Sequence, residues 1–299
     1  MTIQTRAESA LLATTFIWGS TFVAAKILSE SFSSSIYIFI RFCLGTIFFL
    51  LLFRKKLKNI SKITLRNGMI LGGMLGAGMV IQNYGIYQTT ASKAAFITGL
   101  MVIFTPLAQL IIEKRAPKLG NILGIITVTI GLYLLTTPDG SEFNFGDALV
   151  LLSAIVFGVF IVYMDILSKG IDPFQLSFIQ IVSTAIVAAL CVPFEVIRIQ
   201  LSWNTVLVLF YMGFFATVIT TYSQTRFQKE TTPTRAVIIF TLEPVIAAVL
   251  AYFLLREILG ISGIIGGALI IIGVLLSEFS DLLFEKIRSK TLKEEIYHG

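Results

Sequence analysis

Apolar segments about twenty residues long follow one another along the whole chain, separated by short polar stretches. A helix of about 20 residues crosses the ~30 Å hydrocarbon core of a bilayer. Lipid offers no hydrogen bonds to the backbone, so only helices and closed barrels cross it. The segments lack the ~10-residue alternating pattern of barrel strands. The pattern therefore predicts ten transmembrane helices, at about 8–29, 35–53, 66–87, 92–113, 119–137, 146–167, 173–194, 204–227, 234–255 and 260–283.

The second half of the chain repeats landmarks of the first. Thr89-Thr90, Gly124 and Gly131 recur 142 residues later as Thr231-Thr232, Gly266 and Gly273, and Trp18-Gly19 aligns at an offset of 139 with Phe157-Gly158. The duplication predicts two five-helix repeats, residues 1–138 and 139–285, followed by a basic cytoplasmic tail at 286–299. Because five is odd, the second repeat enters the membrane inverted. We therefore expect an all-α integral membrane bundle around a central cavity, typical of alternating-access carriers.

Composition and charge support this class. The chain is 56% hydrophobic and 13% charged, whereas soluble domains carry about 25% charged residues. The net charge of +6 lies mainly in the loops between spans, which disfavours a nucleic-acid surface. With the N-terminus inside, eighteen Lys and Arg residues face the cytoplasm and four face outward. This asymmetry predicts a multi-pass protein of a bacterial-type inner membrane with both termini in the cytoplasm.

Few residues could carry reaction chemistry. Both cysteines, Cys43 and Cys191, fall inside predicted spans, and His298 is the only histidine. The sequence shows no metal-ligand cluster, phosphate-binding loop or nucleophile–base pair. We therefore expect no enzyme activity, no cofactor and no metal.

Glu243 is the strongest candidate for a coupling residue. It lies in the middle of the ninth predicted span, where an ionised carboxylate is costly and by default a functional candidate. A role in proton coupling or in binding a substrate amine competes with a structural ion pair to Arg41. Arg41 itself has two further interpretations: it could extend to the lipid headgroups, or it could bind an anion.

Two prolines predict helix breaks, because proline lacks the N–H that would bond the carbonyl four residues earlier. Pro244 follows Glu243 directly, and Pro106 follows Thr105 in the fourth span. Aligning the two prolines places Thr105 opposite Glu243. The span 4 proline is then one helical turn further from its Thr-Thr pair.

Polar and aromatic positions inside the spans predict a substrate pocket. Gln82 and Gln224 occupy equivalent repeat positions, and neighbouring polar side chains could join them: Asn83 and Thr221. Aromatic walls could come from Trp18, Phe96 and Phe157. Interhelical hydrogen bonding and aromatic packing explain the same residues without a substrate. Lys26 and Lys93 lie near outer helix ends, and we interpret both as interfacial.

Several of these motifs together resemble the EamA type of the drug/metabolite transporter superfamily. They are Trp18-Gly-Ser-x-Phe22, Arg41-Phe42, Ser92-Lys-Ala-Ala-Phe96 through Pro106, Leu242-Glu-Pro-Val245, and Gly-x6-Gly in spans 5 and 10. The resemblance covers about residues 8–280. It implies ten helices in two inverted repeats, with a cavity lined by spans 1, 3, 4, 6, 8 and 9.

The resemblance also implies a function. Such carriers mostly export amino acids, other metabolites or drugs, so we expect a secondary active exporter of a small compound, with protons as a possible coupling partner. We expect contact with lipid and a monomer, with a dimer as the alternative. The competing functions are a nucleotide-sugar or sugar-phosphate exchanger and a non-transporting assembly protein. A phosphate pocket would need more deep cations than Arg41.

Overall fold

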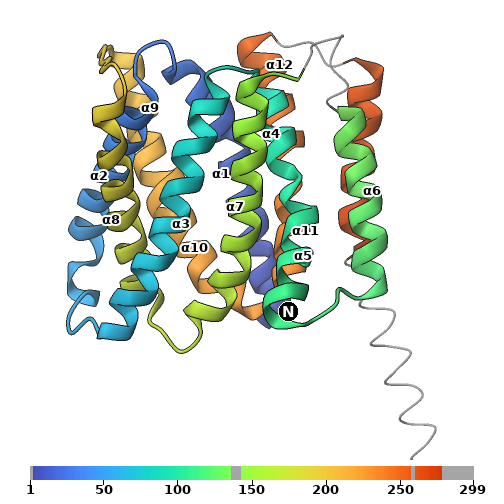
Figure 1. The fold of residues 1–299 in the computed structure, drawn as a ribbon, viewed down its shortest axis with the longest axis horizontal. Coiled ribbons are helices and arrows are strands. Elements are labelled where there is room, and N and C mark those ends of the chain that lie inside the picture. The colour runs from blue at the N-terminus through green and yellow to red at the C-terminus, as the bar shows by residue number, and fades with distance from the viewer. Residues whose placement is uncertain (1–2, 136–142, 257–259, 278–299) are drawn as a thin grey trace, which may run out of the picture.

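The computed structural model describes residues 3–135, 143–256 and 260–277, and this part of the chain is helical apart from its connections and one isolated bridge between Phe32 and Ile199. The helices are α1 (Ile3–Leu28), α2 (Ser34–Phe53), α3 (Lys62–Ile86), α4 (Ala91–Gly99), α5 (Met101–Glu113), α6 (Leu119–Leu135), α7 (Phe145–Ser168), α8 (Pro173–Cys191), α9 (Trp203–Gly213), α10 (Thr220–Phe227), α11 (Pro233–Phe240), α12 (Glu243–Leu255) and an unlabelled final helix, Ile261–Ser277. Figure 1 shows them as a bundle of roughly parallel and antiparallel rods.

The described helices confirm the ten predicted spans. Eight continuous or interrupted helical rods are long and apolar enough to cross a membrane, and α6 and the final helix are two shorter apolar ones. Three spans are interrupted. The fourth consists of α4 and α5, the eighth of α9, the π-helix η3 (Phe214–Ile219) and α10, and the ninth of α11 and α12. The ends of the predicted segments at 137 and 283 lie outside the described residues.

The repeat relation extends to individual helix ends. α4 and α5 reappear as α11 and α12 at an offset of 142 residues, including the N-cap threonines Thr90 and Thr232. The C-caps of α5 and α12 are Lys114 and Arg256, and both adopt the left-handed conformation, with φ of 54° and 57°. The boundary between the proposed repeats at 138 and 139, and the tail at 286–299, lie outside the described residues.

Glycines allow the closest helix approaches. The stripe Gly68, Gly72 and Gly76 of α3 faces α8, where a methyl group at Gly72 would lie 2.5 Å from the carbonyl oxygen of Gln180. Thr184 of α8 donates a hydrogen bond of 3.0 Å back to the Gly72 carbonyl. The stripe therefore packs two spans of the chain against each other.

The final helix packs on α6 by the same means. A methyl group at Gly131 would lie 2.7 Å from the Gly266 carbonyl, and one at Gly124 would lie 3.0 Å from the Gly273 carbonyl. These are the glycines that the repeat pattern picks out in the sequence. The two helices stand together at the edge of the bundle (Figure 1), so the central site is built by the remaining helices.

Candidate substrate cavity

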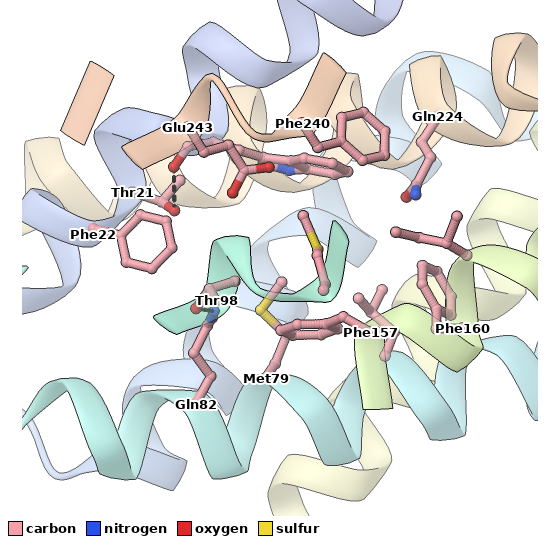
Figure 2. A pocket seen from close by; sticks show the side chains of 14 residues that line it. Thr21, Phe22, Met79, Gln82, Thr98, Phe157, Phe160, Gln224, Phe240 and Glu243 are labelled. Atoms are coloured by element: carbon pink, nitrogen blue, oxygen red, sulfur yellow. Dashed lines mark hydrogen bonds between the residues drawn. The ribbon is translucent and has the colours of Figure 1, made fainter. Parts of the chain in front are cut away.

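A small cavity lies inside the bundle and is shown in Figure 2. Its volume is about 60 Å³. It is lined by Trp18, Thr21, Phe22, Leu75, Met79, Gln82, Thr98, Met101, Phe157, Phe160, Ile161, Gln224, Phe240 and Glu243. One buried water needs at least ~10–15 Å³, so the space holds a few waters. A metabolite fits only if the helices around the cavity move.

The lining follows the internal repeat. Twelve of its residues form six pairs at the two repeat offsets: Trp18 with Phe157, Thr21 with Phe160, Phe22 with Ile161, Gln82 with Gln224, Thr98 with Phe240, and Met101 with Glu243. The cavity therefore lies where the two halves of the chain meet, on the axis that relates them. The positions are symmetric, whereas their chemistry is not.

Met101, and not Thr105, is the counterpart of Glu243. α5 begins at Met101 as α12 begins at Glu243, and both side chains line the cavity. Thr105 is fully buried and is not part of the lining. The proline-based alignment from the sequence was therefore wrong by one helical turn. It failed because the two prolines do not mark the same place in the fold.

The helix breaks themselves occupy equivalent positions. The fourth span is interrupted at Leu100, well before Pro106, which lies inside α5. The ninth span is interrupted at Thr241 and Leu242, and Pro244 lies in the first turn of α12. A first-turn N–H has no intrahelical partner, so proline costs nothing there. Each interruption places a cavity residue, Met101 or Glu243, at the start of the next helix.

Among the described residues that line the cavity, Glu243 is the only acidic one, and none is Lys, Arg or His. Glu243 is buried, with 6% of its surface exposed. Its carboxylate makes neither a hydrogen bond nor an ion pair with the residues that the structure describes. Figure 2 shows it beside Phe240, facing Gln82 and Thr98 across the cavity. An unpaired charge in such a site is costly, and a proton or a cationic ligand removes that cost.

The remaining lining is mostly aromatic and thioether. The rings of Trp18 and Phe240 meet edge to face at a centroid distance of 5.1 Å. Gln82 donates to the Thr98 hydroxyl at 2.9 Å, and Gln224 donates to Gln228 at 2.8 Å. The polar groups are few and held in place, as in sites for small organic ligands.

Arg41 lies away from this cavity. Its buried guanidinium donates to the Thr217 hydroxyl at 2.9 Å and to the Ala216 carbonyl at 2.7 Å, both in the π-helix η3. It also reaches the Tyr37 hydroxyl at 3.4 Å. The structure therefore joins Arg41 to the eighth span and forms no ion pair between it and Glu243.

Five of the eight substrate-site residues named from the sequence line the cavity: Trp18, Gln82, Phe157, Gln224 and Glu243. Asn83 instead donates to Ser34, and Thr221 and Phe96 are outside the lining. The site named from the sequence left out the other nine lining residues: Thr21, Phe22, Leu75, Met79, Thr98, Met101, Phe160, Ile161 and Phe240. Leu75 and Met79 could have been found from the sequence, because they share one helix face with Gln82 at spacings of four and three residues.

The fold is that of a multi-pass membrane protein with an internal cavity whose lining follows the repeat. A model of the EamA-like transporter family matches residues 5–137 and 144–279. The chain belongs to the EamA-like transporter family. This membership confirms the resemblance seen in the sequence and makes the protein a membrane-embedded transporter.

Individual relatives agree with the family assignment. An uncharacterized transporter of Archaeoglobus fulgidus is 29% identical over 270 residues, which cover 90% of this chain and 85% of the relative. The uncharacterized transporter YoaV of Bacillus subtilis is 24% identical over 284 residues, covering 90% and 96% of the two chains. A crystal structure with 16% identity superposes with a TM-score of 0.76 over 95% of this chain and 99% of that one, which supports the fold.

Proposed function

We propose that the protein is a secondary active exporter of a small amphipathic metabolite, amino acid or drug-like compound, working by alternating access. The observation that carries this proposal is a single unpaired carboxylate, Glu243, in an otherwise aromatic and amide-lined cavity. The aromatic walls suit an apolar body, and the carboxylate suits an ammonium group or a proton. The direction of export follows from the family resemblance.

Glu243 would couple transport to protons in a simple way. The carboxylate is stabilised either by a proton or by the amine of the substrate, and one position cannot hold both. A substrate arriving at Glu243 therefore displaces the proton, and a returning proton displaces the substrate. This competition exchanges one for the other across the membrane provided that the empty, ionised site does not switch sides.

The cavity chemistry argues against a sugar-phosphate or nucleotide-sugar exchanger. Phosphate groups are held by several cations or bidentate arginines. The lining of this cavity contains none, and Arg41 is engaged with Thr217 and Ala216. We further propose that both termini face the cytoplasm of a bacterial-type inner membrane, from the excess of basic residues on that side, and that the protein is a monomer that binds no nucleic acid.

Proteoliposomes loaded with the pH dye pyranine test the coupling. A panel of amino acids and aromatic monoamines is added outside, and proton movement is followed together with uptake of each compound. We expect at least one compound to move protons, and Glu243→Gln to abolish that movement while the protein stays monodisperse.

Asp172→Asn is the matched control, because it also converts a carboxylate to an amide. Asp172 caps α8 at the surface, and asparagine caps a helix equally well. The proposal fails if no compound of the panel is taken up, or if Glu243→Gln couples protons as well as Asp172→Asn does.

A further inference from the structure

Among the described residues, two ion pairs connect the halves of the chain, and they are repeat equivalents of each other. Lys93 of α4 lies 2.6 Å from Asp147 of α7, and Arg235 of α11 lies 3.0 Å from Glu8 of α1. Lys93 and Arg235 are 142 residues apart, and Glu8 and Asp147 are 139 apart, which are the two offsets of the cavity lining. Lys93, which the sequence placed at the membrane interface, is therefore part of a buried pair.

Each pair contains the same third residue, the first threonine of the repeated Thr-Thr motif. Thr89 donates to Asp147 at 2.8 Å, and Thr231 donates to Glu8 at 3.2 Å. The second threonine of each motif caps the helix that carries the basic residue. The duplicated motif thus builds two copies of one acid–threonine–base cluster, which we name the Asp147 cluster (Thr89, Lys93, Asp147) and the Glu8 cluster (Glu8, Thr231, Arg235).

The two clusters lie at opposite ends of α1. Glu8 is near its start, whereas Lys26 near its end donates to the Thr89 carbonyl at 2.6 Å and so touches the Asp147 cluster. At 1.5 Å per residue the 18 residues from Glu8 to Lys26 span about 27 Å, close to the hydrocarbon thickness. Trp18 lies between them and lines the cavity.

The charged side chains are shielded from water. Asp147 has a side-chain exposure of 0% and Lys93 of 13%, and Arg235 and Glu8 have 10% and 13%. All four helices that they join also line the cavity or continue directly into a helix that does. Each pair therefore joins two cavity-lining helices from opposite halves of the chain.

We propose that the Asp147 cluster and the Glu8 cluster are the two gates of the transport cycle, which open in alternation. This inference rests on the proposed alternating access. Both clusters are closed in the structure, and the cavity of about 60 Å³ between them admits only a few waters. Breaking one cluster favours opening at its end, while the intact cluster keeps the other end shut.

Thiol labelling from each side of the membrane tests the gates. Met79, in the cavity lining, is replaced by cysteine after Cys43 and Cys191 are changed to alanine. Labelling with a membrane-impermeant maleimide is measured in cells and in inverted vesicles. We expect Asp147→Asn to raise the labelling rate roughly tenfold from the membrane face nearer the Asp147 cluster. The labelling rate from the opposite face should fall. Glu8→Gln should produce the opposite pattern.

Glu230→Gln is the matched control, since it removes an ion pair with Arg226 that stays within one half of the chain. It should leave labelling unchanged from both faces. Lys93→Gln removes the basic residue of the Asp147 cluster. It is the test variant to use if Asp147→Asn does not fold. If labelling of the cluster variants rises equally from both faces, or stays at the level of Glu230→Gln, the two clusters are not gates.

The readout needs no substrate and no pH gradient. One-sided labelling without uptake of any panel compound would support the two clusters as gates and would reject the proposed proton coupling. Coupled uptake with labelling that ignores the clusters would retain the coupling and reject the gates.

Discussion

Replacing Gly72 by alanine tests how closely the two halves of the bundle must approach. The added methyl group would lie 2.5 Å from the Gln180 carbonyl oxygen and 2.9 Å from the Gln180 Cα, both atoms of the α8 backbone. A side chain could rotate away, whereas a helix backbone must move as a unit. Gly72→Ala therefore separates α3 from α8.

The expected loss of stability follows from three contributions. Overpacking costs about 1–3 kcal/mol, and the upper value applies because backbone atoms are struck. The Thr184–Gly72 hydrogen bond, at 3.0 Å, contributes roughly 0.6 kcal/mol that is lost on separation. Alanine recovers about 1 kcal/mol of helix propensity. The net change is a loss of about 2.6 kcal/mol, or roughly 80-fold in the unfolding equilibrium.

Gly73→Ala is the internal control, since a methyl group there meets nothing within 4 Å. It should gain up to about 1 kcal/mol from propensity alone. Equilibrium unfolding in mixed dodecylmaltoside–SDS micelles, followed by circular dichroism, compares the two. Equal stability of Gly72→Ala and Gly73→Ala would refute the close packing of α3 on α8 as the cause of the loss.

Three further predictions concern the cavity and its surroundings. Arg41→Met should lower stability by about 1–3 kcal/mol in the same assay, because the charged hydrogen bonds to the Ala216 carbonyl and the Thr217 hydroxyl are lost and only the Thr220 hydroxyl still donates to Ala216, while the KM of a transported panel compound stays unchanged; a raised KM with full stability would place Arg41 in substrate binding. Trp18→Leu removes an aromatic side chain from the cavity lining; since a ring contact with an aromatic substrate is worth about 0.5–1.5 kcal/mol, the KM of an aromatic amine should rise about two- to tenfold more than that of an aliphatic one, and an equal effect on both would count against an aromatic wall. Gly78→Ala places a methyl group 2.5 Å from the Phe157 ring, so uptake of the bulkier panel compounds should fall more than that of the smaller ones, and equal losses would contradict it.

The candidate site was partly within reach of the sequence. Four of the lining residues could be found from the sequence because they lie inside apolar spans and have counterparts in the other repeat: Trp18, Phe157, Gln82 and Gln224. Glu243 could be found because a lone acid in a span is unusual. Thr98 and Met101 were missed since single threonines and methionines are common in spans. Their role depends on the interruption of the fourth span at Leu100, which no proline or glycine motif marks in both repeats.

The sequence by itself determined the number of spans and the duplicated pattern. These depend on local chemistry, because lipid requires about twenty apolar residues with every backbone group paired. Only the tertiary structure decided which polar groups meet. Arg41 joined the π-helix rather than Glu243, and Lys93 and Arg235 found acids in the opposite half of the chain. Such partners depend on how each helix is rotated and packed against its neighbours, and one helix's residue spacing does not contain that information.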